Sequence, residues 1–311
     1  MENNELISIV ITTYKRSNRI GFAIESAINQ TYRNIEVVVV DDNASIIGER
    51  EKTEKIVGKY KNVKFIKNTQ NLGGAESRNV GARAAKGKLI SFLDDDDQYL
   101  PDRIEKLYRL YCKNKSKKLG LVYCSCFAVN GRGDILGEYI HTKSGMPIYK
   151  QMLGCIAGTS MWLIPKEALM DVGGFDLVPS KQDSTVILKL LVAGYCIIGT
   201  SDRLVLYLEH DKNDKASSIS GIKPSNIEGI LKYRELCRRY YDMLENENQI
   251  DDVECNFSRQ LVTLYIANKK RKNAIVELNN ILRRRPFCKA AITSIVKVVF
   301  PNLYRKRLGV K

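Results

Sequence analysis

Residues 89–97 read Leu-Ile-Ser-Phe-Leu-Asp-Asp-Asp-Asp, a strand-like apolar run that passes directly into four carboxylates. Because like charges at this spacing repel one another, a protein interior would not hold the four side chains unpaired. At the carboxyl end of a strand they would instead offer oxygen ligands to a divalent cation, at the sheet edge where open α/β proteins bind ligands. The other interpretation of this segment alone is a solvated acidic loop.

Upstream of this stretch, short β-branched runs alternate with amphipathic segments. The pattern predicts four strands and four helices, with the strands at residues 6–11, 35–40, 63–66 and 88–93 and the helices at 19–29, 49–60, 75–85 and 101–115. Such an alternation favours right-handed βαβ units around a parallel sheet.

Downstream of Leu119 the rhythm changes. Strands are predicted at 121–129, 135–140, 159–164, 195–198 and 204–208, with a short helix starting at Pro165 and another helix at 183–193. From Pro224 onward the sequence is polar and helical in pattern. We therefore expect an α/β fold with a mixed sheet flanked by helices over residues 1–222, and a helical, basic C-terminal extension over residues 223–311.

The charge of the chain is concentrated at one end. The 311 residues are 44% hydrophobic and 27% charged, as is ordinary for a soluble globular protein, but the net charge is +15. Residues 259–311 hold 14 Lys and Arg against a single acidic residue, Glu277. A basic segment of this kind attracts nucleic acid or an anionic membrane surface.

Several protein classes lose support. No run approaches the roughly 18 apolar residues that a membrane span needs, and the acidic N-terminus does not resemble a signal peptide. The eight cysteines form no Cys-x-x-Cys pair and have no histidine nearby, which favours reduced, buried thiols in a cytosolic protein over a zinc site. The glycine patterns of P-loop and dinucleotide-binding proteins are absent.

Polar side chains follow the first two predicted strands. Thr12 and Tyr14 follow the first, and Asp42 follows the second. Adjacent parallel strands would bring these turns together around one small ligand, with a carboxylate for an imide N–H or a ribose hydroxyl and an aromatic ring for a base. The alternative for Asp42 is an Asx turn or a helix N-cap.

The segment 71–83 begins Asn-Leu-Gly-Gly, and its glycines allow close backbone approach before a predicted helix. Arg78 lies in the first turns of that helix, where it could meet a diphosphate. The alternative is an ordinary surface arginine.

Together these segments resemble the family 2 inverting glycosyltransferases with the GT-A fold. The resemblance covers about residues 6–220, and its matching segments are 8–16, 30–36, 40–45, 71–81, 92–101, 173–176, 182–183 and 194–195. It implies a Rossmann-like mixed sheet and a metal-dependent enzyme. That enzyme would transfer a sugar from a UDP-sugar to a hydroxyl group with inversion of configuration.

The resemblance also implies roles for single residues in donor binding. Thr12 and Asp42 match positions that hold the uracil of the nucleotide sugar, and Tyr14 lies in the same turn. Arg78 matches a residue near the diphosphate.

For the metal, Mn²⁺ or Mg²⁺, the resemblance points to the acidic stretch. Asp94 and Asp96 match the metal-binding motif. Asp95 fits an overlapping register and is assigned to the donor, and Asp97 is a weaker candidate. Some relatives place a histidine near His210 as a third metal ligand or a diphosphate contact, although a surface histidine in a polar loop is the alternative.

Asp183 falls at the family's catalytic-base position. Many members carry Glu-Asp there, whereas this chain has Gln182-Asp183. A base at this position would deprotonate the acceptor hydroxyl as it attacks. The alternative is that Asp183 caps a helix.

The end of the basic tail suits a membrane surface. Residues 290–299 are largely apolar and are interrupted by Lys297, and the cation runs 283–285 and 305–307 flank them. This pattern favours shallow docking on an anionic leaflet, the alternative being a solvated helical face packed on the catalytic domain. We expect a cytoplasmic protein, peripheral on the inner face of the cell membrane, with a glycan or lipid-linked acceptor from cell-surface polysaccharide synthesis and no nucleic-acid partner.

Two other activities remain open at this point. Nucleotidylyl transfer also uses carboxylates, a metal and an α/β sheet, but the chain lacks a glycine-rich activating loop at its start. A basic nucleic-acid-binding or scaffold protein would explain the tail, but the predicted acidic site would repel nucleic acid.

Overall fold

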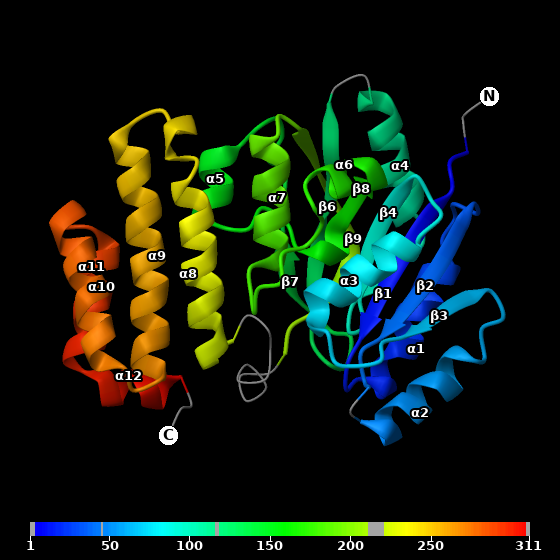
Figure 1. The fold of residues 1–311 in the computed structure, drawn as a ribbon, viewed down its shortest axis with the longest axis horizontal. Helices are drawn as coiled ribbons and strands as arrows, with labels where there is room; N and C mark the ends of the chain where they lie inside the picture. The colour runs from blue at the N-terminus through cyan, green and yellow to red at the C-terminus, as the bar shows by residue number, and fades with distance from the viewer. Residues whose placement is uncertain (1–3, 45, 116–117, 211–220, 309–311) are drawn as a thin grey trace. The chain divides into compact units, whose positions relative to one another are not determined.

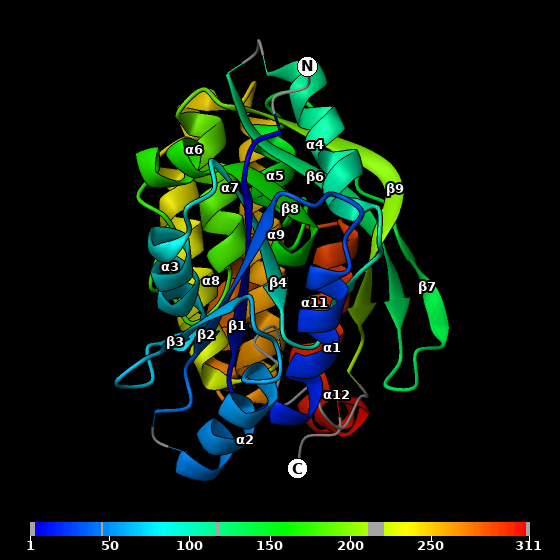
Figure 2. The same cartoon turned by 90° about the vertical axis from the view of Figure 1, so that its right-hand side faces the viewer.

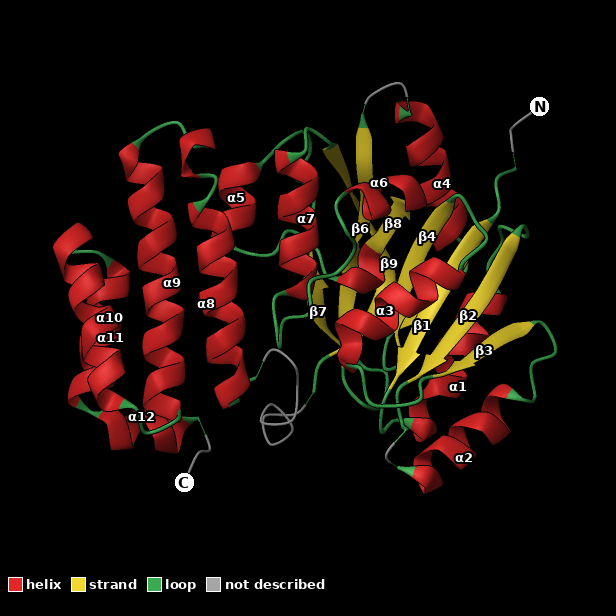
Figure 3. Ribbon diagram, viewed as in Figure 1, coloured by secondary structure: helices red, strands yellow, loops and turns green. Residues whose placement is uncertain are grey.

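The computed structural model describes residues 4–44, 46–115, 118–210 and 221–308 (Figures 1 and 3). They form two compact units. The first comprises the described residues of Met1–Pro147, Ile156–Leu177 and Lys189–Glu209, and the second those of Ile148–Cys155, Val178–Leu188 and His210–Lys311. The division of the chain into residues 1–222 and 223–311 stays a prediction.

The first unit is built on a mixed sheet, as the sequence predicts. In the described part of the chain its strand order is β3-β2-β1-β4-β8-β6-β9-β5, and β7 pairs with β6. The strands are β1 (Ile7–Thr13), β2 (Ile35–Asp41), β3 (Val63–Lys67), β4 (Leu89–Asp94), β5 (Gln98–Tyr99), β6 (Leu119–Val129), β7 (Ile135–Tyr139), β8 (Trp162–Pro165) and β9 (Cys196–Leu208).

The four N-terminal strands are parallel, and β8 joins them antiparallel to β4. Ile9, Val38 and Ile90, at the centres of β1, β2 and β4, are each completely buried. Such strands are buried on both faces, which is why they read as continuous apolar runs in the sequence.

Helices cover both faces of these strands. Figure 2 shows α3 on one face and α1 and α4 on the other. The helices of this unit are α1 (Ser17–Ile28), α2 (Ile47–Val57), α3 (Gly73–Ala84), α4 (Arg103–Asn114), the 3₁₀ turn η1 (Thr159–Met161) and α6 (Lys166–Asp171).

A glycine sets the distance between α3 and the sheet. A Cβ atom on Gly81 would lie 2.3 Å from Cγ1 of Val10 in β1 and 3.2 Å from Cγ2 of Val40 in β2. The helix therefore rests on the strands through a position that has no room for a side chain.

We expect Gly81→Ala to lower the free energy of unfolding by about 1–3 kcal/mol, because the added methyl group overpacks the interface of α3 with the sheet. Gly48→Ala is the matched control, since nothing lies within 4 Å of its Cβ position on α2. Urea titration followed by circular dichroism measures both. Equal stabilities of the two variants would contradict the close packing of α3.

Two local predictions were wrong, and two short elements were not predicted. The predicted strand at 159–164 is the 3₁₀ turn η1 followed by the strand β8. Residues 196–208 form one long strand, β9, and not two short strands, because they pair with β6 along their length with several shifts of register. The two-residue strand β5 and the short helix α5 (Ile148–Leu153) have no counterpart in the sequence prediction. Both are too short to produce a periodic pattern.

The second unit is helical. It contains α5, the larger part of α7 (Gln182–Val192), α8 (Pro224–Arg238), the 3₁₀ turn η3 (Tyr241–Met243), α9 (Glu247–Ala267), α10 (Arg271–Arg284), α11 (Lys289–Val299) and α12 (Pro301–Arg307). Helix α9 contacts α8, α10, α11 and α12 (Figure 1). Among the described helices, none is both long enough and apolar enough to cross a bilayer.

A buried ion network ties three of these helices together. Arg234 of α8 contacts Glu254 of α9 and Glu277 of α10, and Ser258 donates to Glu277. The side chains of Arg234 and Glu254 are 7% and 2% exposed, so each charge depends on its partner. The network explains the burial of Glu277, the single acidic residue of the basic segment.

Candidate active site

The carboxyl ends of β1, β2 and β4 meet at one edge of the sheet. Thr12, on β1, is in register with Val40 of β2 on one side and with Asp94 of β4 on the other. Tyr14 and Asp42 directly follow β1 and β2. The strand register therefore brings Thr12, Tyr14, Asp42 and Asp94 to the same edge, which is the arrangement expected from the order of the strands.

The four consecutive carboxylates alternate in exposure. The side chains of Asp94 and Asp96 are 33% and 10% exposed, whereas Asp95 and Asp97 are buried. Asp95 and Asp96 form a turn directly after β4, which the backbone N–H of Asp97 closes by donating to the carbonyl oxygen of Asp94 at 3.1 Å. Asp94 and Asp96 are consequently the two carboxylates of this stretch that a ligand can reach.

Arg16 bridges two of these carboxylates. Its guanidinium Nη1 lies 2.9 Å from Oδ1 of Asp95 and 2.7 Å from Oδ2 of Asp96. Although burial of Arg16 works against its charge, Asp96 and Asp95 raise its pKa. The backbone N–H of Tyr14 also donates to Asp95, at 3.3 Å. Burial, followed by the charge of Asp96, raises the pKa of Asp95 to about 6.

Asp97 is buried, and its carboxylate binds the backbone of the neighbouring strand β9. Its Oδ1 accepts a hydrogen bond of 3.0 Å from the backbone N–H of Leu208, at the end of β9. Burial and the neighbouring Asp96 and Asp94 carboxylates raise its pKa well above the ordinary value. Asp97 thereby links the acidic stretch to β9 in the interior of the fold, and its role as a weaker candidate metal ligand stays a prediction.

Arg78 faces the other accessible carboxylate. Its Nη2 lies 2.5 Å from Oδ1 of Asp94, and its guanidinium lies 5.7 Å from the ring centre of Phe175. Phe175 is held in turn by Asn79, whose side-chain amide exchanges two hydrogen bonds with the Phe175 backbone. It also stacks on the buried Trp162. The glycine-rich turn that ends in Phe175 thus places an aromatic ring against the guanidinium group of Arg78.

Asp42 organises the start of α3. Its buried carboxylate accepts hydrogen bonds of 2.8 Å from Asn68 Nδ2 and from the backbone N–H groups of Leu72 and Gly73. These N–H groups belong to the helix start and have no partner within the helix. Asp42 therefore binds the loop 68–73 to β2, and its role toward a uracil base stays a prediction.

Asp183 and His210 belong to the second unit. Asp183 lies in the first turn of α7, where its Oδ1 accepts from the backbone N–H of Ser184 at 2.7 Å and from Ser184 Oγ at 3.3 Å. Burial, and then the charge of Asp183, raise the pKa of the Cys155 thiol well above its ordinary value. The thiol therefore stays protonated beside Asp183. His210 is half-buried and directly precedes the undescribed residues 211–220.

Two accessible carboxylates at this edge are suited to a metal ion. In the described ranges, no group of three or more Asp, Glu, His or Cys side chains is arranged to hold a metal. Asp94 and Asp96 offer the hard oxygen ligands that Mg²⁺ and Mn²⁺ take. Mg²⁺ in particular is commonly held by one or two carboxylates and completed by substrate phosphates and water. The donor set thus fits an ion that binds together with a nucleotide diphosphate.

Sequence reasoning missed two residues of this site. Arg16 received no role, although it lies two positions after Tyr14 in the same turn. Ser160 is the other, since its Oγ accepts a hydrogen bond of 3.1 Å from the backbone N–H of Asp94. Arg16 could have been found by looking for cations in the turns that are expected at the same sheet edge as the acidic stretch. Nothing in the sequence connects Ser160 with Asp94.

Comparison with known sequences gives a single family. The sequence profile described as glycosyl transferase family 2 matches residues 8–173, more than half of the chain. An uncharacterized glycosyltransferase of Haemophilus influenzae is 29% identical over 310 residues, which is 98% of this chain and 100% of that protein. Escherichia coli WfaP, a UDP-Glc:alpha-D-GlcNAc-diphosphoundecaprenol beta-1,3-glucosyltransferase, is 38% identical over 102 residues, which is 32% of this chain and 39% of WfaP.

Comparison with solved structures supports the same fold. The mannosyltransferase PcManGT of Pyrobaculum calidifontis, solved in complex with GDP-Man and Mn²⁺, superposes with a TM-score of 0.58. The superposition covers 98% of this chain and 83% of PcManGT at 15% sequence identity. At that identity the likeness concerns the fold, and the GT-A-type mixed sheet predicted from the sequence is confirmed.

Proposed function

The chain belongs to glycosyl transferase family 2, and on that premise we propose that it transfers a sugar from a UDP-sugar to a hydroxyl group of a glycan or lipid-linked acceptor. The observation that carries this proposal is the accessible pair Asp94 and Asp96 at the carboxyl edge of the sheet, with Thr12 in register beside Asp94. This is the edge where α/β sheets bind nucleotides.

The donor would lie across the three turns at this edge. In the proposed site Thr12 and Asp42 contact the uracil, Tyr14 lies in the same turn, and Arg78 contacts the diphosphate. A uridine donor is supported by WfaP, whose described activity uses UDP-Glc. Arg78 already pairs with Asp94, so it is close to the place where a bound diphosphate would meet the acidic stretch.

Asp94 and Asp96 would hold the metal ion, and His210 is a further candidate ligand. Asp95 would contribute to binding of the donor. A bound Mn²⁺ or Mg²⁺ would neutralise the charge that develops on the departing diphosphate. The chain itself contributes positive charge here, since Arg78 and Arg16 face the same carboxylates. The leaving group would therefore meet two guanidinium groups beside the acidic stretch.

Asp183 is the proposed general base. It would take the proton of the acceptor hydroxyl while the hydroxyl oxygen bonds to the anomeric carbon of the sugar. The bond from that carbon to the diphosphate oxygen breaks in the same step, and the nucleoside diphosphate leaves. Attack from the face opposite the leaving group inverts the configuration of the anomeric carbon.

The proposed acceptor is lipid-linked and the proposed pathway is cell-surface polysaccharide synthesis. WfaP, which acts on a diphosphoundecaprenol acceptor, supports this class. We propose that the enzyme works in the cytoplasm as a peripheral protein on the inner face of the cell membrane. The net positive charge of residues 259–311 supports this location.

A panel of nucleotides and sugar nucleotides tests the donor. We expect UDP to raise the melting temperature in the presence of Mn²⁺, because a ligand that binds only the folded state stabilises it. GDP should have a smaller effect, and release of UDP from UDP-Glc, UDP-GlcNAc and UDP-Gal then identifies the sugar. GDP-Man hydrolysis without any effect of the uridine nucleotides would contradict the proposal.

A further inference from the structure

Helix α11 has two apolar faces, and only one of them is packed. Ala291, Ser294 and Val298 are buried, and α11 contacts α9. An adjacent side of the helix presents a row of large apolar residues that are between 38% and 69% exposed and that continues past the end of the helix: Ile292, Ile295, Val296, Val299, Phe300 and Leu303. The helical members follow the spacing i, i+3, i+4 and i+7, so they form one stripe.

Lys297 does not interrupt this stripe. Its ammonium group donates a hydrogen bond of 2.8 Å to Thr263 Oγ1 of α9 and lies 5.2 Å from the ring centre of Tyr304. Burial, and then the charge of Arg259, lower the pKa of Lys297 to about 8. The cation that breaks the apolar run in the sequence is thus turned toward α9, and the outer face of α11 is continuous.

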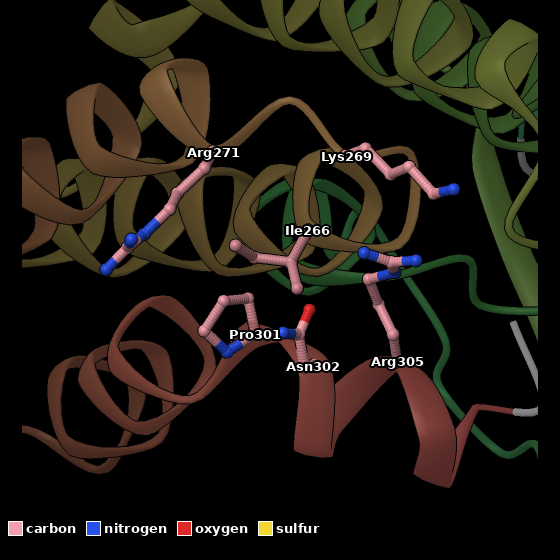
Figure 4. A pocket seen from close by; sticks show the side chains of 6 residues that line it. All are labelled: Ile266, Lys269, Arg271, Pro301, Asn302 and Arg305. Carbon is pink, nitrogen blue, oxygen red and sulfur yellow. The ribbon is translucent and has the colours of Figure 1, made fainter. Parts of the chain in front are cut away.

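The surroundings of the stripe are positively charged. From Leu278 to Lys311 the sequence contains nine Lys and Arg and no acidic residue. Arg283 of α10, Lys289 of α11, and Lys306 and Arg307 of α12 are exposed. Three more cations line a hollow of about 200 Å³ at α12, formed by Ile266, Lys269, Arg271, Pro301, Asn302 and Arg305 (Figure 4).

In this hollow Arg305 reaches toward the side of Ile266 where Lys269 lies, whereas Arg271 lies on the other side (Figure 4). The Nε atom of Arg305 is buried, and within the described residues it has no hydrogen-bond partner. No acidic residue lines the hollow. This end of the unit therefore combines exposed apolar surface with uncompensated cations.

We infer that the outer stripe of α11, continued by Phe300 and Leu303, is the surface by which this protein docks on a bilayer containing anionic lipids. The inference rests on the proposed peripheral location and assigns it to one face. Apolar side chains can enter the boundary between headgroups and acyl chains, while the surrounding cations attract the lipid phosphates. A second copy of the chain is a poorer occupant, because it would place two strongly basic segments against each other.

Vesicle flotation with the full-length protein tests the docking face. We expect the wild type to float with phosphatidylglycerol-containing vesicles and not with pure phosphatidylcholine vesicles. The triple variant Ile292→Ser, Val296→Ser, Val299→Ser removes three exposed apolar residues, and we expect it to bind at least about tenfold more weakly. The matched control Ile47→Ser, Ile135→Ser, Leu136→Ser removes three exposed apolar residues from the first unit and should bind as the wild type does.

Three further variants test the position of the docking face more locally. Val296→Trp should show a blue shift of fluorescence and quenching by brominated lipids on anionic vesicles, because the native Trp162 is completely buried. Lys306→Gln and Arg307→Gln should each weaken binding by about fivefold at low salt.

The outcomes distinguish two questions: whether the protein binds membranes, and whether it binds them through α11. If the wild type does not float with anionic vesicles, the peripheral location itself is refuted. If it floats and the α11 variant floats equally well, the location stands and the face is wrong. Loss of a dimer, or of RNA binding, as the only effect of the α11 variant would assign the stripe to that partner and overturn the inference.

Discussion

Replacing Asp183 by asparagine is expected to lower kcat by roughly 10²- to 10⁴-fold while the dissociation constant for the donor stays unchanged. The amide keeps the size of the side chain and an oxygen that can accept the hydrogen bond from the backbone N–H of Ser184. It cannot take a proton from the acceptor hydroxyl. The expected signature is therefore loss of transfer with intact donor binding, measured by product formation and by calorimetric titration with UDP.

Asp202→Asn is the matched control for this variant, because Asp202 is an exposed carboxylate of the first unit. It should retain full transfer. A circular dichroism melting curve of the Asp183 variant should match that of the wild type within a few degrees. If Asp183→Asn keeps more than about half of the transfer rate, Asp183 is a helix-start residue and another group serves as the base.

The parallel half of the sheet was predictable because its signal is local. Strands such as β1 and β4 are buried on both faces, so each leaves a largely apolar run in the sequence. The order of the first two strands also indicated that Thr12 and Asp42 lie near each other, since parallel strands end at a common edge. It did not indicate that β4 lies beside β1 and brings Asp94 next to Thr12. The same logic failed for β9, whose polar middle at Thr200 and Ser201 resembles a turn. Its pairing with β6, more than 70 residues away, keeps that segment extended.

The chemistry of single side chains was less predictable than their position. The sequence identifies four carboxylates in a row, but it does not tell which of them face solvent. That depends on Asp97 turning toward the backbone of Leu208 and on Asp95 accepting from Tyr14. The pairing of Arg16 with Asp95 and Asp96 likewise depends on the return of the chain from β1 to β4. Long-range contacts of this kind leave no periodic pattern in the sequence.

Asp96→Asn is expected to abolish the effect of Mn²⁺ on donor binding. Asp94 and Asp96 are the two accessible carboxylates of the acidic stretch, so they are the proposed ligands of the ion. In the wild type, chelation with EDTA should weaken UDP binding and lower the transfer rate by roughly 10²- to 10³-fold, because the charge of the leaving diphosphate would no longer be neutralised. In the variant, binding and rate should already be low, and EDTA should change neither.

The control for Asp96→Asn must remove a carboxylate from the same part of the chain without touching the proposed site. Asp102→Asn does so, because Asp102 pairs with Lys106 at the start of α4 and its side chain is 41% exposed. Titration of each protein with Mn²⁺ in the presence of UDP, followed by calorimetry, compares the two. The Asp102 variant should keep the wild-type response to metal. A normal Mn²⁺ response in the Asp96 variant would show that the ion is held without this carboxylate. The acidic stretch would then serve mainly to bind Arg16 and Arg78, whose guanidinium groups could by themselves receive the leaving diphosphate.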